Sequence, residues 1–158
     1  MATSTTQSIW RSGGGDTTKT AYAGSMVMFA AFTFDPTQTS GTVKNANGQA
    51  IILPIGAVVT NIATNGGATG GTSPTLDMGF TLYVTGTASP QALVNETPAD
   101  SKQSVNWSGA TAGASLGAVM SATELVYITG RAGASAATGG TITGRIEYYV
   151  PTDGQYTA

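Results

Sequence analysis

Large apolar side chains occupy alternate positions in residues 75–84 and again in residues 141–150. A period of two predicts an antiparallel β-strand with one face in the core and one in solvent. On this pattern Asp77 faces solvent. Arg145 and Glu147 share the outer face of the second segment, so we expect a surface or inter-subunit ion pair. The predicted core faces are Leu76, Met78, Phe80, Leu82 and Val84, and then Ile142, Ile146, Tyr148 and Val150.

Residues 25–34 (SMVMFAAFTF) are apolar on both alternating faces. A strand at the surface of a monomer would alternate apolar with polar residues. The pattern therefore predicts a strand buried on both sides, either inside a sandwich or at a subunit contact. A short buried helix is the alternative, which the Phe and Val content disfavours. Val27 and Phe29 are candidate interface residues.

The rest of the chain reads as short strands separated by turns. Pro54 and Gly56 divide residues 50–64 into two strands, and residues 65–74 form a Gly-rich loop. Ser89 could cap one helical turn over Gln91–Val94. Further strands are expected at 104–107, 115–120 and 123–130. About eight short strands with Gly-rich turns predict an all-β, antiparallel β-sandwich or jelly roll.

One five-residue sequence occurs twice. Residues 68–72 (ATGGT) recur as residues 137–141, and each copy lies between two expected strands. Two related hairpins could pair in one fold, although chance repetition is equally compatible with a chain rich in these residues.

Residues 1–24 are rich in Ser, Thr and Gly and hold two isolated large apolar residues, Ile9 and Trp10. We expect an extended N-terminal arm over residues 1–24 and a single β-sandwich domain over residues 25–158. A disordered terminus is the alternative. In the arm interpretation Ile9, Trp10 and Arg11 form a docking contact.

The composition excludes most chemistry. The chain of 158 residues has no His and no Cys, and only 9% of its residues are charged, against about 25% in average domains. Acid–base, nucleophilic and metal chemistry draw on these residue types. We therefore expect no enzyme activity and no cofactor. Asp35, Asn45 and Asn47 lack the acidic pattern of a calcium loop.

Charge and hydropathy also limit the partners. The net charge of −2 and the absence of a basic stripe argue against nucleic-acid binding. The longest apolar runs are too short to cross a membrane, and the polar start lacks a signal-peptide core. We expect synthesis in a cytoplasm without export, and no membrane partner.

Several aromatic residues could stack on sugar rings. They include Trp107, Tyr83, Tyr127, Tyr148 and Tyr149. In the more ordinary interpretation Tyr127 and Tyr148 face the core and Trp107 packs against a sheet edge, because Tyr and Trp often bury an apolar body while one polar tip stays bonded.

Three segments carry a family resemblance. They are LPIGAVVT at 53–60, PTLDMG at 74–79 and TGGTITGRIEYYV at 138–150. Their order resembles small β-structured virion proteins of tailed bacteriophages, of the head decoration, cement or head-fibre type. The resemblance covers about residues 50–150. It implies a β-sandwich or jelly-roll unit, often a homotrimer, bound to a lattice of the major capsid protein.

The functional expectation follows from both lines of reasoning. We expect a structural virion protein that decorates or cements the phage head by packing contacts alone, with Trp107 as a further candidate contact. The alternative is a fibre or tail-associated module that recognises a host-surface glycan.

Overall fold

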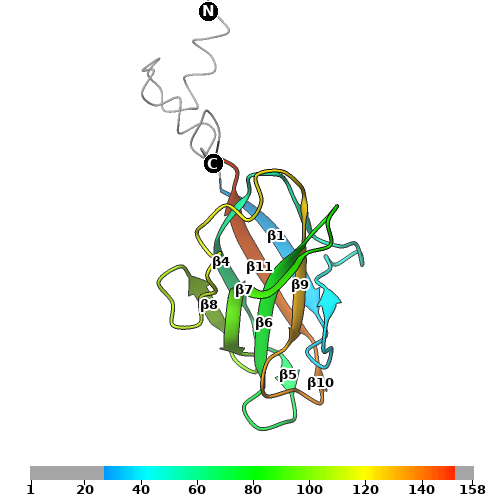
Figure 1. Ribbon diagram of the computed structural model, residues 1–158. Coiled ribbons are helices and arrows are strands. Elements are labelled where there is room, and N and C mark those ends of the chain that lie inside the picture. The colour runs from blue at the N-terminus through cyan, green and yellow to red at the C-terminus, as the bar shows by residue number, and fades with distance from the viewer. Residues whose placement is uncertain (1–26, 152–158) are drawn as a thin grey trace, which may run out of the picture.

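The computed structural model describes residues 27–151, which form eleven β-strands (Figure 1). None of these residues belongs to a helix that could cross a membrane. The strands are β1 (Met28–Phe34), β2 (Gly41–Thr42), β3 (Ile52–Leu53), β4 (Val58–Thr64), β5 (Ala68–Thr69), β6 (Thr75–Leu82), β7 (Ala88–Pro98), β8 (Gln103–Asn106), β9 (Val126–Ala132), β10 (Gly139–Gly140) and β11 (Ile142–Tyr149).

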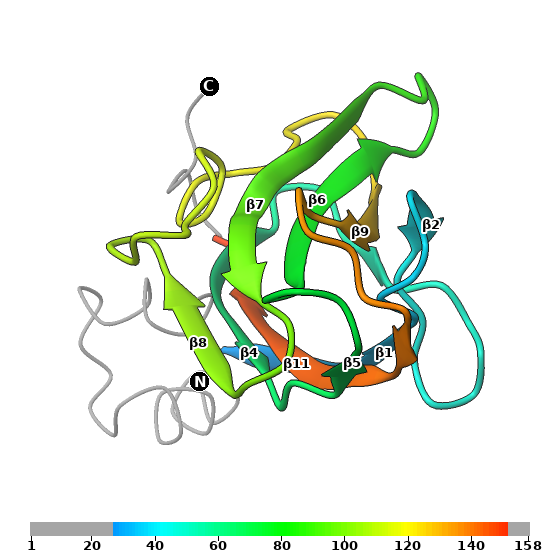
Figure 2. The same cartoon turned by 90° about the horizontal axis from the view of Figure 1, so that it is seen from below.

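Two antiparallel sheets face each other across the core, as the end-on view in Figure 2 shows. The first sheet has the strand order β1-β11-β4-β8. The second has the order β2-β9-β6-β7, and β3 also pairs with β9. The predicted all-β antiparallel sandwich is confirmed.

The strand order specifies the topology further. Because β2 and β3 both pair with β9, we count them as one edge strand; β5 and β10 form a separate two-stranded sheet. Eight strands then remain. We number these eight strands 1 to 8 along the chain. Neighbouring strands in the first sheet are then 1-8-3-6, and neighbouring strands in the second sheet are 2-7-4-5. We infer from this order a jelly-roll topology.

The core consists of the inward side chains of both sheets. Ile62 and Ile146 from the first sheet and Leu76, Met78 and Ile128 from the second are all buried. These residues stand at alternate positions of their strands, as the pleat of a strand requires. The core faces predicted for 75–84 and 141–150 are confirmed over Leu76–Phe80 and Ile142–Ile146, where the large apolar residues are buried.

The predicted helical turn at Gln91–Val94 is wrong, because these residues belong to β7. β7 pairs with β6 through two register shifts, with Met78 opposite Val94. The pairing buries Leu93 and Val94 completely. A cap at Ser89 offers only a local gain of about 1 kcal/mol, which burial of two large side chains exceeds.

The strand predicted at residues 115–120 is also wrong. This segment is a series of turns that packs beside β4, where Gly117 N–H donates to Val59 O at 2.8 Å and Met120 N–H donates to Ala57 O at 3.1 Å. Gly117 has φ +84°, which an extended strand does not accommodate. Only a single bridge, between Val58 and Val119, remains of strand pairing here.

The repeated sequence does pair with itself. Ala68 lies opposite Gly140 and Thr69 opposite Gly139, so β5 and β10 are the two copies of the repeat joined in antiparallel register. Gly67 and Gly140 have φ of +120° and +97°, and a Cβ on either would overlap a backbone carbonyl of the opposite segment. The two copies therefore pair in one fold, as the hairpin interpretation expected.

Candidate functional site

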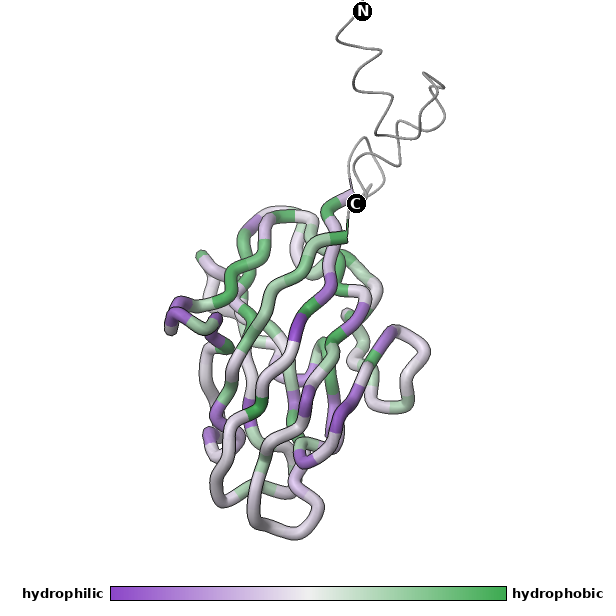
Figure 3. Tube along the Cα trace, turned by 180° about the vertical axis from the view of Figure 1, so that it is seen from behind, coloured by the Kyte–Doolittle hydropathy of each residue, from purple (hydrophilic) through white to green (hydrophobic). Residues whose placement is uncertain are grey.

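The outer face of β1 is apolar and exposed. Phe32 and Phe34 point into the core, whereas Phe29 is 62% exposed and Val27 49% exposed. Ala31 follows on the same outer side and is also exposed. We call Val27, Phe29 and Ala31 the β1 face; Figure 3 views the molecule from the side of the first sheet. The sandwich-interior alternative is therefore wrong for the described residues, and the expected burial at a subunit contact stays a prediction for this face.

Charged residues of β11 flank the β1 face. Phe29 lies opposite Glu147, and Ala31 lies opposite Arg145. The guanidinium carbon of Arg145 stands 5.5 Å from the centre of the Phe29 ring, which is cation–π range. Arg145 also forms an ion pair with Glu147 at 3.0 Å, as the sequence predicted. The β1 face is thus an apolar strip at the sheet edge with a charged pair on its inner border.

A second exposed group lies on the outer side of the second sheet. The rings of Tyr83 and Tyr127 stack with centroids 5.0 Å apart, and Ile52 is the strand neighbour of Tyr127. Tyr127 stands between the buried residues Val126 and Ile128, so it faces outward, and the expectation that it faces the core is wrong. Tyr148, by contrast, packs against the core as expected.

The carboxylate of Glu124 holds the turn beside these tyrosines. It accepts hydrogen bonds from Val84 N–H at 2.6 Å and from Thr85 N–H and Oγ1, each at 3.1 Å. Desolvation by burial acts to raise the pKa of Glu124, but these three donors outweigh it and the pKa lies below its usual value. The ionised carboxylate therefore fixes the β6–β7 turn.

Trp107 is 69% exposed at the end of β8. Its neighbours Asn106 and Ser108 form a local turn, in which Asn106 Oδ1 accepts from Ser108 N–H at 3.1 Å and from Ser108 Oγ at 2.8 Å. A Cβ on Gly117 would stand 3.1 Å from Trp107 Cβ, so the base of the Trp107 side chain packs against the turn that contains Gly117. Within residues 27–151, the aromatic stack is the Tyr83–Tyr127 pair, and Trp107 is not part of it.

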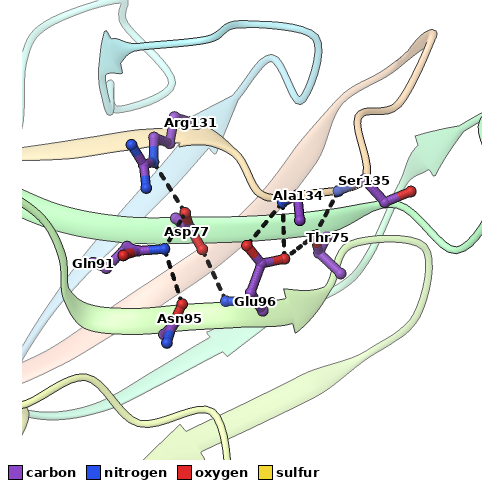
Figure 4. A network of polar contacts seen from close by, with 8 residues as sticks. All are labelled: Thr75, Asp77, Gln91, Asn95, Glu96, Arg131, Ala134 and Ser135. Carbon is purple, nitrogen blue, oxygen red and sulfur yellow. Dashed lines mark hydrogen bonds and ion pairs between the residues drawn. The ribbon is translucent and has the colours of Figure 1, made fainter.

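Asp77 is buried, with 1% exposure, which contradicts its predicted solvent-facing position. Its Oδ2 accepts from Arg131 Nε at 3.0 Å and from Gln91 Nε2 at 2.9 Å, and its Oδ1 accepts from Glu96 N–H at 2.8 Å (Figure 4). A buried carboxylate persists only when charge and hydrogen bonds compensate its desolvation. Asp77 therefore links β6 to β7 and β9.

The side chain of Glu96 makes a similar link beside it. Its two carboxylate oxygens accept from Ala134 N–H at 2.8 and 2.9 Å, and one also accepts from the hydroxyl of Thr75. Glu96 itself has φ +55°, which is rare for a residue with a side chain. Sequence spacing gave no indication that Asp77 and Glu96 would lie together. The residues that donate hydrogen bonds to the two carboxylates lie on or directly beside three different strands. Both carboxylates border a shallow cleft of about 330 Å³ together with Arg131.

A larger cleft of about 490 Å³ lies beyond the end of β1, between Asp35, Gln38 and Lys44. Asp35 accepts from Thr37 N–H at 2.9 Å and from Thr37 Oγ1 at 2.8 Å, which lowers the pKa of its carboxyl. Asn45 Oδ1 accepts from Asn47 N–H and Gln49 N–H. These oxygens thus close turns, and residues 27–151 contain no cluster of three acidic, His or Cys side chains placed to hold a metal ion.

The structure places the remaining candidate residues as follows. Val27 and Phe29 lie together on the β1 face, and Trp107 lies at the far edge strand of the same sheet. The candidates Ile9, Trp10 and Arg11, and the arm of residues 1–24, lie outside the described residues.

Comparison with known proteins finds a likeness to a solved structure. No family model matches the chain, and no curated protein sequence matches it. A chain of the structure described as "Cyanophage Pam1 capsid asymmetric unit" is similar at 18% sequence identity and a TM-score of 0.49, over 81% of this chain and 87% of that one.

Proposed function

We propose that this chain is a structural virion protein of the decoration or cement type, which binds an assembled phage head and stabilises it by packing contacts. The observation that carries the proposal is the β1 face, where Phe29 and Val27 stand exposed on a rigid antiparallel sheet. Exposed apolar side chains gathered at one place indicate an interaction site. The resemblance of residues 50–150 to small phage virion proteins supports the same function.

The proposed mechanism is adhesion without a catalytic step. The carboxylates of the buried Asp77 and the half-buried Glu96 are engaged in joining strands, which suits a scaffold role. Copies of the chain, arranged as a homotrimer, bind the capsid lattice, and the N-terminal arm of residues 1–24 adds to the attachment. Because the chain binds the assembled shell and not its free subunits, occupancy stabilises the shell by mass action.

The proposal is tested by co-sedimentation of the purified chain with phage heads that lack it. We expect saturable binding and a higher temperature of head disruption. Phe29→Ser should abolish binding while the circular dichroism spectrum stays unchanged, since Phe29 contributes little to the core. The matched control is Val84→Ser, which removes a 79% exposed apolar side chain from the β6–β7 turn, away from the β1 face, and should bind normally. Failure of the unsubstituted chain to bind heads would refute the function.

Exposure of Trp107 favours a second candidate function, recognition of a host-surface glycan by a fibre or tail module. Trp107 presents its side chain to solvent beside the polar Asn106 and Ser108, and flat aromatic rings with polar neighbours are suited to sugar rings. A glycan array separates the two functions. Binding that disappears in Trp107→Ala would support this candidate, and an array without hits would reject it.

A further inference from the structure

The outer edge of β1 is open over most of its length. Thr33 N–H donates to Lys44 O at 2.8 Å, and Lys44 N–H donates to Thr33 O at 3.3 Å, so Thr33 directs its backbone groups away from β11. Backbone groups of an antiparallel strand alternate in direction, which makes Ala31 and Phe29 point the same way. Within residues 27–151 no strand pairs with this side of β1.

The other sheet edges in the described chain are protected. β8 has only four residues and they are mostly polar, while β2 and β3 have two residues each. β7 begins with a proline-containing stretch at Pro90, and a loop covers its outer side, where Gly113 N–H donates to Leu93 O at 2.9 Å. Short length, polar side chains, proline and loop cover are the usual protections of an edge strand.

β1 has none of these protections. Its seven residues, MFAAFTF, include no charge and no proline, and its register with β11 runs without a bulge. Both of its faces are apolar near the start: Phe29 is exposed on the outer side, and Met28 is 36% exposed on the inner side. A strand that covers this edge must therefore be uncharged and must carry apolar side chains on both faces.

We propose that residues 5–10 of the same chain dock on this edge as an added strand. This segment, TTQSIW, has no charged residue and contains β-favouring Thr. Ile9 and Trp10 are consecutive, so in a strand one lies on each face, beside Phe29 on one side and Met28 on the other. Of the chain outside the described residues, 16–23 carries Asp16 and Lys19, and 152–158 carries Asp153.

The segment that joins residues 5–10 to β1 is long enough for this docking. Residues 11–26 join Trp10 to Val27 and include three consecutive glycines at 13–15. A Gly-rich linker of about 16 residues spans roughly 20–24 Å, and the open edge from Val27 to Ala31 is about 14 Å long. Effective concentration is greatest when the linker length is comparable to the distance it spans. The chain's own segment therefore outcompetes the same segment of a second copy in dilute solution.

The added strand would extend the proposed function. It places Ile9 or Trp10 beside Phe29, which enlarges the apolar strip offered to the particle; this consequence rests on the proposed function. The docking itself is a property of the free chain. It is therefore measured without particles, so that failure of docking and failure of particle binding are separate results.

Disulfide trapping tests the docking, because the chain has no Cys of its own. Gln7→Cys and Ser8→Cys, which fall on opposite faces of the segment, are each combined with Ala31→Cys on the exposed β1 face. Cross-strand neighbours have Cβ atoms about 4.5–5.5 Å apart, close to disulfide range. The matched control combines the same two substitutions in the N-terminal segment with Ser104→Cys, which lies at an exposed position on the opposite edge strand β8. The variants are oxidised at low protein concentration and analysed by mass spectrometry.

We expect one of the two cysteines, at position 7 or at position 8, to form an intramolecular disulfide with the cysteine at position 31. Neither should form a disulfide with the cysteine at position 104. Disulfide-linked dimers between positions 7 or 8 and position 31 would instead assign the edge to a second copy's segment. Dimers linked through position 31 alone would indicate edge-to-edge pairing of two β1 strands. Either result, or no disulfide at all, overturns the proposal.

Hydrogen exchange gives a readout free of engineered thiols. In the full-length chain the outward N–H groups of Phe29 and Ala31 should be protected by the added strand. Replacing both Ile9 and Trp10 by Ser should speed their exchange by about tenfold or more, while the buried Ile146 at the centre of the sheet exchanges at its former rate. Equal exchange at Phe29 and Ala31 in the two proteins contradicts the docking.

Discussion

Arg131 Nε donates a hydrogen bond to Asp77 Oδ2 at 3.0 Å, and the two side chains differ strongly in exposure, 34% for the arginine and 1% for the aspartate. The arginine thus stays in contact with water while it compensates a carboxylate that has none. Gln91 and the Glu96 N–H supply the remaining donors, so three strands converge on one buried acceptor.

Removing that acceptor should destabilise the fold strongly. Asp77→Ala leaves the Glu96 N–H without its acceptor, and Gln91 Nε2 and Arg131 Nε each lose their hydrogen bond to the carboxylate, so we expect a loss of about 3 kcal/mol in the free energy of unfolding. Arg145→Ala breaks the solvent-exposed pair with Glu147 and serves as the control, with a loss below about 1 kcal/mol. Urea denaturation measures both. Similar losses in the two variants would contradict the role assigned to Asp77.

The Glu124 carboxylate should make stability depend on acid pH. Its pKa is lowered in the folded chain, so its contribution is present above the unfolded value near 4.5 and is lost as the pH falls through the folded value. Glu124→Gln should therefore lower the melting temperature at pH 7, and the gap to the unsubstituted chain should narrow below about pH 4.5. Asp100→Asn, at an exposed position, is the control and should show no such narrowing. A gap that is constant with pH would disprove the assignment.

Gly67, which directly precedes the first copy of the repeat, should differ from an ordinary turn glycine. Gly67→Ala places a Cβ against the carbonyl oxygen of Thr141 and forces a side chain into φ +120°. We expect a loss on the order of 3 kcal/mol. Gly86 has φ +71° with no atom near the added Cβ, so Gly86→Ala should cost only about 1 kcal/mol. Thermal unfolding of the two variants compares them, and equal melting temperatures would be inconsistent with the close approach of β5 and β10.

Alternation of apolar residues was a reliable guide where a strand has one buried face. It located β6 and β11 and the inward positions of Ile142 and Ile146, because the period of two follows directly from the pleat. It also located β4, which follows the turn at Pro54–Gly56.

Alternation was misleading at Asp77, where the rule predicts solvent on the second face. The partners that allow burial, Gln91 and Arg131, are 14 and 54 residues away, and no local pattern encodes their approach. The strand β7 was missed for a related reason. Ser89 and the polar residues around Pro90 suggested a capped helical turn, and only the irregular pairing with β6 shows why Leu93 and Val94 become buried. The β1 face was visible as an apolar strand, but its exposure depends on its position at the sheet edge.

The pairing of the first long strand with the last has a consequence for how the polypeptide forms. Met28 lies opposite Tyr148, so a nascent chain carries β1 without its β11 partner until residues 142–149 have left the ribosome. Contacts this distant along the chain make folding slow and leave apolar strands exposed meanwhile. Truncation before residue 142 would therefore remove β11, the strand that covers the inner edge of β1, and such fragments should aggregate rather than persist as smaller soluble units.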